Sequence, residues 1–280
     1  MSRLAPVGSH LYSSLMAKLR KRKPKKPLLG SHQKCWLWGR NAVTETLQVG
    51  KWRILELLLA DSLQADELDE AAQRALALDV PVKIEPPERL RRICHHPEHQ
   101  GYVAKMAPFP YADADTLLSE PPPMPLYAVL DRIQDPQNFG AIVRSAEGFG
   151  LNALFISERQ QVGVTAAVAR ASAGAVNRVP IARVEDLSAL AERLKDAGAA
   201  IVGASEKADT TVIECDFRRP TAILIGSESR GICPALLERC DLLVHIPRYG
   251  QIGSLNAAAA AAILFYEARR QRAAPLDARG

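Results

Sequence analysis

Polar side chains and glycines gather in three short segments of the carboxyl-terminal half of the chain, each placed directly after an apolar run. The first, QNFGAIVRSAEGFG at 137–150, holds Asn138 and Arg144; the second is GSESRG at 226–231, and the third is PRYGQIGSLN at 247–256. Amide, carboxylate and guanidinium groups can orient a nucleophile, and glycine-rich turns let a ligand approach the backbone. Connecting turns rarely need so many glycines beside polar side chains, so these segments predict a catalytic or binding site.

The elements that must position these segments follow from the alternation of apolar runs and helical patterns after Leu126. Such runs, bounded by Gly and Pro, indicate strands buried on both faces, as in a parallel sheet covered by helices on both sides. Open α/β sheets build their sites at the carboxyl ends of the strands, where the three segments fall. We predict strands at 126–131, 153–157, 199–205, 221–226 and 242–247, and helices near 140–148, 164–173, 184–196, 234–239 and 255–270.

The first segment has a specific expected geometry. We expect Asn138 to lie in the turn after the first of these strands, with Gly140 opening the helix. Arg144 then lies one helical turn further and can point back toward the strand ends. A surface arginine without a function is the alternative interpretation of Arg144.

The amino-terminal part of the chain predicts a smaller α/β module. Strands are expected at 53–60, 80–85 and 99–106, and helices after Gly39 and at 66–78 and 86–94. The proline-rich segment that follows is typical of a linker. We therefore divide the chain into an arm at 1–31, a small module at 32–107, a linker at 108–124, a larger domain at 125–272 and a tail at 273–280.

Composition limits the class of protein. Of the 280 residues, 48% are hydrophobic and 5% aromatic, which predicts an aliphatic core. We find no apolar run of about 18 residues and no signal peptide, so we expect no membrane span. The five cysteines are scattered and form no CxxC pair, which favours a reducing, cytoplasmic location over a disulfide framework.

The amino-terminal arm is strongly basic. No acidic residue precedes Glu45, and residues 18–26 read KLRKRKPKK. Such an arm can contact nucleic-acid phosphates and release their counterions. A solubilising tail and an organelle-targeting peptide remain alternatives.

Several short motifs suggest other functions but lack the structural context or spacing that those functions require. GFGLNA at 148–153 follows a helix and precedes a strand, the reverse of a dinucleotide-binding fingerprint, so its glycines indicate a helix end. CHHPEH at 94–99 lacks the spacing of a tetrahedral zinc site, so we expect no metal. The sequence also lacks a GxxxxGK[ST] loop, an HExxH helix and a GxSxG elbow.

Taken together, the three segments resemble the SpoU (TrmH-like) family of RNA 2′-O-ribose methyltransferases within the SPOUT class. The similar motifs are NFGAIVR at 138–144, IGSESRG at 225–231, and Ile246-Pro247 followed by Gly250 and by SLN at 254–256. SAGA at 172–175 and Val-Pro at 179–180 add agreement, and the resemblance covers about residues 33–272. It does not explain the basic arm.

The front module is similar to the L30-like RNA-binding domain of the 23S rRNA guanosine-2′-O-methyltransferase branch, through GRNAV at 39–43 and HQGYVA at 99–104. The resemblance therefore implies an L30-like RNA substrate-binding domain at 32–107 and a SpoU methyltransferase domain at 125–272, acting on a guanosine in 23S rRNA. A tRNA ribose methyltransferase of the same family is one alternative. A non-catalytic RNA-binding or ribosome-assembly factor is another, although the intact Asn138, Arg144, Glu228 and Asn256 count against it.

The resemblance also implies S-adenosylmethionine as cofactor, a trefoil knot in the carboxyl-terminal half and a homodimer with sites built between two chains. The implied cofactor-binding residues are Gly203, Gly226, Ser227, Ile246, Pro247, Gly253 and Leu255. The alanine-rich helix at 255–270 can form the dimer interface or pack only within its own chain. An unbroken alanine run follows Asn256, where family members often carry Val and Ser.

The implied catalytic residues are Asn138, Arg144, Glu228, Ser254 and Asn256. Arg144 is expected near the attacking hydroxyl, either as base or as a positioning group, since a guanidinium pKa exceeds about 12. Asn138 would orient Arg144 or the substrate, and Glu228 would hold polar partners in place. Ser254 and Asn256 would shape the cofactor loop, and capping the last helix is the simplest role for Asn256.

Overall fold

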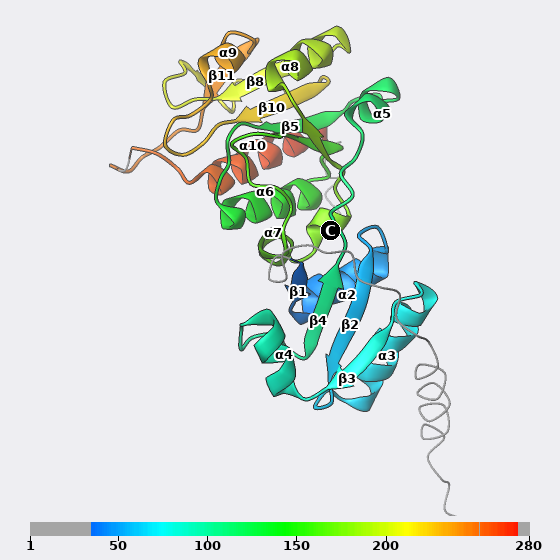
Figure 1. The fold of residues 1–280 in the computed structure, drawn as a ribbon. Coiled ribbons are helices and arrows are strands. Elements are labelled where there is room, and N and C mark those ends of the chain that lie inside the picture. The colour runs from blue at the N-terminus through cyan, green and yellow to red at the C-terminus, as the bar shows by residue number, and fades with distance from the viewer. Residues whose placement is uncertain (1–34, 252, 274–280) are drawn as a thin grey trace, which may run out of the picture. The chain divides into compact units, whose positions relative to one another are not determined.

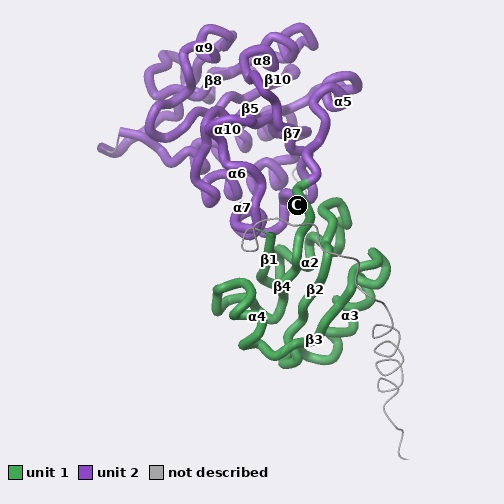
Figure 2. Tube along the Cα trace, in the orientation of Figure 1, with its two compact units in different colours: residues 1–109 green, residues 110–280 purple. Residues whose placement is uncertain are grey.

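The computed structural model describes residues 35–251 and 253–273, which form two compact units. The first unit ends at Phe109 and the second begins at Pro110 (Figure 2). The predicted basic arm lies outside the described residues, as does the predicted tail beyond Ala273. Each unit is described separately below.

The first unit is a four-stranded mixed sheet with helices on both faces (Figure 1). Its strand order is β1-β4-β2-β3; β2 and β3 are parallel, and β4 is antiparallel to β1 and β2. The strands are β1 (Trp36–Trp38), β2 (Ile54–Ala60), β3 (Val82–Glu85) and β4 (Tyr102–Met106), and the helices are α2 (Arg40–Val49), α3 (Ala65–Ala77) and α4 (Pro87–Cys94).

Alternation along β2 divides this unit into two apolar layers. Leu58 and Ala60 face α4 and form one cluster with its Leu90 and Cys94. The intervening residues of β2, Leu57 among them, point to the opposite face, where α2 and α3 lie (Figure 1). The predicted strands and helices are confirmed here, within a few residues. Strand β1 escaped prediction because three residues are too few to show a period.

The second unit is a seven-stranded parallel sheet with the order β7-β6-β5-β10-β8-β11-β9. The parallel sheet predicted from the sequence is confirmed. The strands are β5 (Leu126–Leu130), β6 (Ala153–Ser157), β7 (Ile181–Val184), β8 (Ala200–Ala204), β9 (Thr210–Thr211), β10 (Thr221–Ile225) and β11 (Leu242–His245). The helices are α5 (Ala114–Ser119), α6 (Pro136–Gly148), α7 (Ala166–Ala171), η1 (Ala175–Asn177), α8 (Leu187–Asp196), α9 (Pro234–Leu237) and α10 (Ala257–Arg272).

Helices cover both faces of this sheet (Figure 1). Leucines of α8 and α9, such as Leu190 and Leu236, pack on one face against Tyr127 and Phe155. Helices α6, α7 and α10 lie on the other face. Helices α6 and α7 approach closely at Gly140, where a Cβ would come within 2.4 Å of the Ala171 Cβ. The glycine predicted to open a helix thus serves helix packing inside α6.

Four elements of the second unit were not predicted: β7, β9, α5 and the short helix η1. Strands β7 and β9 lie at the two edges of the sheet, where short, partly polar strands lack a continuous apolar run. The segment expected to be only a linker contains α5. Asp113 caps this helix by accepting a hydrogen bond from the Thr116 N–H at 2.8 Å.

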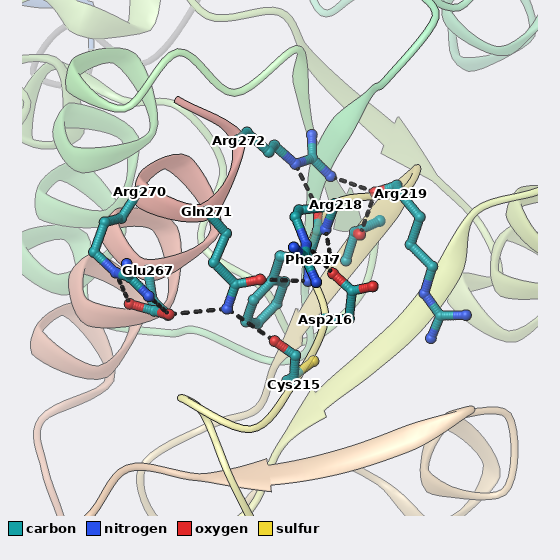
Figure 3. A network of polar contacts seen from close by, with 10 residues as sticks. Cys215, Asp216, Phe217, Arg218, Arg219, Glu267, Arg270, Gln271 and Arg272 are labelled. Carbon is teal, nitrogen blue, oxygen red and sulfur yellow. Dashed lines mark hydrogen bonds and ion pairs between the residues drawn. The ribbon is translucent and has the colours of Figure 1, made fainter. Parts of the chain in front are cut away.

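The carboxyl end of α10 is fixed to the chain that leads into β10 (Figure 3). The Arg272 guanidinium donates to the carbonyl oxygens of Phe217 (2.8 Å), Arg219 (2.6 Å) and Met124 (2.9 Å). Gln271 accepts from the Phe217 N–H at 2.9 Å and donates to the Cys215 carbonyl at 2.9 Å. These bonds fix the last helix against the amino end of a central strand.

Candidate active site

The three predicted segments begin where β5, β10 and β11 end. Strands β5 and β10 are hydrogen-bonded neighbours, with Leu130 paired to Ile225, so the first two segments start at the same edge of the sheet. One boundary differs from the prediction. Helix α6 begins at Pro136 and is capped by Asp135, which accepts from the Gln137 N–H at 3.0 Å. Asn138 therefore lies in the first helical turn and not in the preceding loop.

Asn138, Glu228 and Asn256 form one hydrogen-bonded cluster, although each comes from a different segment. The Asn138 Nδ2 donates to the Glu228 Oε1 at 2.7 Å, and the Asn256 Nδ2 donates to the same oxygen at 2.6 Å. The Asn256 Nδ2 also lies 2.9 Å from the Asn138 Oδ1. The backbone N–H of Ala257 approaches Glu228 Oε1 at 3.3 Å. Residues far apart in the sequence thus meet at one polar centre.

The cap of α10 sets the orientation of this cluster. The Asn256 Oδ1 accepts from the backbone N–H groups of Ala258 (2.9 Å) and Ala259 (3.2 Å). Because that oxygen faces the helix, the Asn256 amide nitrogen must face Glu228 and Asn138. Glu228 and Asn256 are exposed and Asn138 is half-buried, so the cluster is accessible to a ligand.

The turn after β10 is tight, and this explains two of its glycines. Ser227 and Gly231 form a two-way backbone bridge, with N···O distances of 3.2 and 2.8 Å. A Cβ on Gly226 would lie 2.1 Å from the Gly231 carbonyl carbon and 2.2 Å from the Ile232 nitrogen. Gly231 has φ +64°, in the left-handed region that favours glycine. The two glycines therefore let the turn close tightly while it presents the Glu228 side chain to Asn138 and Asn256.

Two residues that the sequence analysis did not single out brace this turn. Asp131, buried at the end of β5, accepts from the Cys233 N–H at 2.8 Å. Its carboxylate also binds Arg132, which donates from Nε at 3.0 Å and from Nη2 at 3.1 Å. Arg132 Nη2 reaches the Gly231 carbonyl at 3.3 Å. An acid followed by arginine at the end of a buried strand is the sequence signal that could have identified the pair.

Two other predicted catalytic residues lie outside the cluster. Arg144 is exposed on α6, and Ser254 is exposed in the loop before α10. Within the described part of the chain, neither side chain makes a hydrogen bond or ion pair with Asn138, Glu228 or Asn256. The structure therefore brings together three of the five residues.

Most of the predicted cofactor residues follow β10 and β11, two strands that flank β8 in the sheet. Gly226 and Ser227 come directly after β10, Ile246 and Pro247 come directly after β11, and Gly253 and Leu255 lie in the loop before α10. Ile246 is half-buried and Leu255 is 38% exposed, so both offer apolar surface. Apolar side chains and backbone groups are the chemistry that a ligand with a flat apolar ring and polar edges would require.

Gly203 is the exception among them. It is buried inside β8, where a Cβ would lie 2.7 Å from both the Cys240 Sγ and the Leu243 Cδ2. Close packing between β8 and its neighbours is enough to require a glycine at this position.

The histidine segment after α4 is internally bonded. The His96 Nδ1 accepts from the Glu98 N–H at 3.2 Å, and the His99 Nδ1 accepts from the Gly101 N–H at 3.1 Å. Burial lowers the pKa of His99. Across residues 35–251 and 253–273, no group of three or more acidic, histidine or cysteine side chains is arranged to hold a metal ion. No helix in these ranges has the length and apolarity needed to span a membrane.

Comparisons with known proteins agree with this geometry. The family model described as SpoU rRNA Methylase family matches residues 125–266. The model described as RNA 2′-O ribose methyltransferase substrate binding matches residues 36–112. The two matches fall on the sheet that carries the cluster and on the amino-terminal module, respectively.

Individual relatives cover most of the chain. YacO of Bacillus subtilis (strain 168), assigned to the TrmH family of tRNA/rRNA methyltransferases, is 34% identical over 245 residues, covering 86% of this chain and 98% of YacO. A tRNA/rRNA methyltransferase of Mycolicibacterium vanbaalenii is 39% identical over 238 residues, covering 84% of this chain and 76% of the relative.

Solved structures share the fold. The SpoU methyltransferase AviRb from Streptomyces viridochromogenes, crystallised with AdoMet, is 28% identical with a TM-score of 0.72, covering 86% of this chain and 91% of AviRb. An AdoMet-bound rRNA methyltransferase from Sinorhizobium meliloti, 22% identical, has a TM-score of 0.74 over 98% of this chain and 99% of that one. The SPOUT methyltransferase fold and the amino-terminal substrate-binding domain are thus confirmed, and the knot stays a prediction. The chain belongs to the SpoU/TrmH family of RNA methyltransferases.

Proposed function

We propose that this RNA methyltransferase transfers a methyl group from S-adenosylmethionine to the ribose 2′-hydroxyl of a guanosine in 23S rRNA. The observation that carries the proposal is the Asn138–Glu228–Asn256 cluster, which joins the three motif segments at the carboxyl edge of the sheet. Relatives assigned to tRNA/rRNA methylation and structural neighbours crystallised with AdoMet support it. The amino-terminal substrate-binding match favours rRNA, because it is an added RNA-holding module.

The loops at this edge fit the cofactor. Backbone groups of the Gly226–Gly231 turn can pair with adenine edges, and the close approach of Gly226 to Gly231 and Ile232 fixes the shape of the turn. The apolar side chains of Ile246 and Leu255 can hold the ring between them. When bound, S-adenosylmethionine supplies an electrophilic methyl group on a positively charged sulfur. The protein contributes position: oriented reactants can lower a barrier by roughly 7–11 kcal/mol.

The polar residues have separate proposed tasks. Glu228 holds the amides of Asn138 and Asn256, so that both are fixed before RNA binds. Arg144, exposed and outside the cluster, orients the ribose 2′-oxygen or a neighbouring phosphate. A guanidinium group is a poor base, so an RNA phosphate or water is the better proton acceptor. Ser254 shapes the loop that leads into α10.

We further propose that two chains complete each site. Helix α10 buries Leu264 and Phe265 within its own chain but leaves Ile263 (37%) and Tyr266 (54%) exposed. The sequence leaves two roles open for this helix, a dimer interface and core packing within one chain. Its exposed face can serve the first role and its buried face the second. A second copy that covers the exposed face would explain why Arg144 finds no partner among the described residues of one chain. All five cysteines are free thiols, which supports a cytoplasmic location.

The proposal is tested by mapping ribose methylation across total RNA in a strain that lacks the gene. A 2′-O-methyl group blocks alkaline cleavage at its own linkage, so one protected position should disappear from 23S rRNA and return on complementation. Loss of a protected tRNA position would instead select the tRNA alternative. An unchanged methylation map, with no heat of S-adenosylmethionine binding in calorimetry, would favour a non-catalytic RNA-binding factor.

A further inference from the structure

Helix α4 in the first unit presents an exposed row of arginines. Leu90 and Cys94 turn inward, whereas Arg89, Arg91 and Arg92 are exposed. Arg89 lies 3.3 Å from a Glu85 oxygen. Within the described ranges no carboxylate lies within 4.0 Å of Arg91 or Arg92, and the Arg92 Nε contacts only the Glu88 carbonyl, at 3.4 Å. Two cations of this short helix are therefore left for an external anion.

The opposite face of the same sheet has the opposite charge. Helix α3 carries four carboxylates and one arginine, a net charge of −3. Its arginine, Arg74, is already paired with Glu70 at 2.6 Å. Helix α4 carries three arginines and one glutamate, a net charge of +2. A polyanion that approaches this unit is attracted to α4 and repelled by α3.

Aromatic rings come from β1 and from the two residues that directly follow α4. The Trp38 ring of β1, part of the cluster that α4 covers, lies 5.8 Å from the His96 ring at a tilt of 34°. His95, which ends α4 with φ +54°, is exposed beside them. Cations next to aromatic rings suit a chain that offers both phosphates and bases, because phosphates pair with arginine and unpaired bases stack on rings.

We propose that the α4 face, defined as Trp38, Arg91, Arg92, His95 and His96, binds the RNA substrate. Arg91 and Arg92 contact its phosphates, and an unpaired base lies near the rings. The inference rests on the proposed function only in taking RNA as the substrate. It deepens that function by assigning one face of the amino-terminal unit to substrate binding and leaving the α3 face free.

The test compares full-length variants for binding to protein-free rRNA purified from ribosomes, by filter binding between 0.05 and 0.3 M KCl. The double variant Arg91→Gln/Arg92→Gln removes both cations. Glu88→Gln, on the same helix, removes a negative charge. Arg74→Gln, on α3, removes one arginine from the opposite face. Calorimetry with S-adenosylmethionine and thermal unfolding check that each variant is folded and binds cofactor.

Each lost phosphate contact should lower the slope of log affinity against log salt by about 0.7–0.9. The double variant should therefore bind rRNA about 25- to 60-fold more weakly at 0.1 M salt, with a slope lower by about 1.4–1.8. Glu88→Gln should bind as well as wild type or better, and Arg74→Gln should match wild type. Affinity of the double variant within twofold of wild type, or an equal loss in Arg74→Gln, would overturn the α4 assignment.

The failure of this inference is distinguishable from the failure of the proposed function. Weaker rRNA binding by the double variant, in a protein that transfers no methyl group, would support the α4 face and refute the methyltransferase proposal. Normal methyl transfer with unchanged rRNA binding by the double variant would refute the α4 face alone. If both proposals hold, the double variant raises the KM for rRNA and leaves kcat unchanged.

Discussion

At the scale of single residues, Asn256 has two tasks that use different atoms. Its oxygen caps α10, and its amide nitrogen joins Asn138 and Glu228. A helix cap contributes about 0.5–2 kcal/mol to stability, whereas the amide contacts fix polar groups for catalysis. Substitutions that keep one atom and remove the other can separate the two contributions.

Asn256→Ser keeps a capping oxygen but is too short to bridge Glu228 and Asn138, whereas Asn256→Ala removes both functions. We expect the alanine variant to lose about 0.5–2 kcal/mol of unfolding free energy and the serine variant to stay close to wild type. Both should lose methyl transfer to a similar extent, about 100-fold, because the cluster is no longer oriented. Denaturant unfolding and transfer of radiolabelled methyl to rRNA measure the two effects. Wild-type turnover by Asn256→Ser would remove the amide bridge from the mechanism.

Gly226 offers a second residue-level test, with Gly250 as its matched control. A Cβ at Gly226 would collide with backbone atoms of Gly231 and Ile232, whereas nothing lies within 4 Å of a Cβ at Gly250. Gly226→Ala should therefore cost about 1–3 kcal/mol of stability and weaken S-adenosylmethionine binding, and Gly250→Ala should do neither. Thermal unfolding and calorimetry give the comparison. If both alanine variants bind the cofactor equally well, the tight turn is not part of its site.

Which site residues could be predicted depended on where they stand in the sequence. Asn138, Glu228 and Asn256 follow strand ends within glycine-bounded segments, so the sequence alone indicated that they meet. Asp131 and Arg132 lie between β5 and the first segment. An acid followed by arginine marks them as a possible pair, but the sequence does not say that they contact Gly231 and Cys233. That contact spans about a hundred positions and depends on which strands are neighbours.

At the scale of elements, the buried carboxylate of Glu267 holds two side chains at the carboxyl end of α10 (Figure 3). Glu267 is 7% exposed and accepts hydrogen bonds from Arg270 at 2.8 Å and from Gln271 at 2.9 Å. The hydrogen bonds from Arg270, partly opposed by burial and assisted by Gln271, lower the pKa of Glu267 below its usual value of 4.5. The charged form is thus favoured in the folded state.

A lowered folded-state pKa means that the unfolded chain binds the proton more tightly. The contribution of Glu267 is therefore present above the unfolded-state value near 4.5 and is lost as pH falls through the lower folded-state pKa. Glu267→Gln should be less stable at pH 7 and should lose less unfolding free energy between pH 7 and pH 3 than wild type. Urea unfolding across this range measures both, with Glu147→Gln on the exposed side of α6 as control. Parallel pH profiles for Glu267→Gln and wild type would contradict this account.

Most elements followed from apolar periodicity, and those that did not have a common physical cause. Strand β9 has two residues and β7 has four, and each is held by a single neighbouring strand. Such edge strands are defined by pairing and burial in the folded sheet. A short window of sequence does not contain this information. The predicted helix begins later than α6 does for another reason: Pro136 is compatible both with a loop and with the first turn of a helix that follows a cap such as Asp135.

At the scale of the whole molecule, the two units suggest a division of labour. The amino-terminal unit matches a substrate-binding family and carries exposed arginines on α4. The carboxyl-terminal unit matches the methylase family and holds the polar cluster. The alternation of apolar runs predicted the parallel sheet and the motifs predicted the family, whereas the knot and the homodimer are implied by the resemblance alone.

The central claim is that the segments after β5, β10 and β11 form one site for methyl transfer to RNA, with Arg144 positioning the acceptor. The most direct measurement is the transfer of radiolabelled methyl from S-adenosylmethionine to rRNA by wild type, Arg144→Ala and Arg218→Ala. Arg218, an exposed arginine beside Asp216 near the amino end of β10, is the matched control. We predict that Arg144→Ala unfolds at the wild-type temperature and binds S-adenosylmethionine, but transfers methyl at least about 100-fold more slowly, while Arg218→Ala is unaffected. Turnover by Arg144→Ala within a few-fold of wild type would contradict the account.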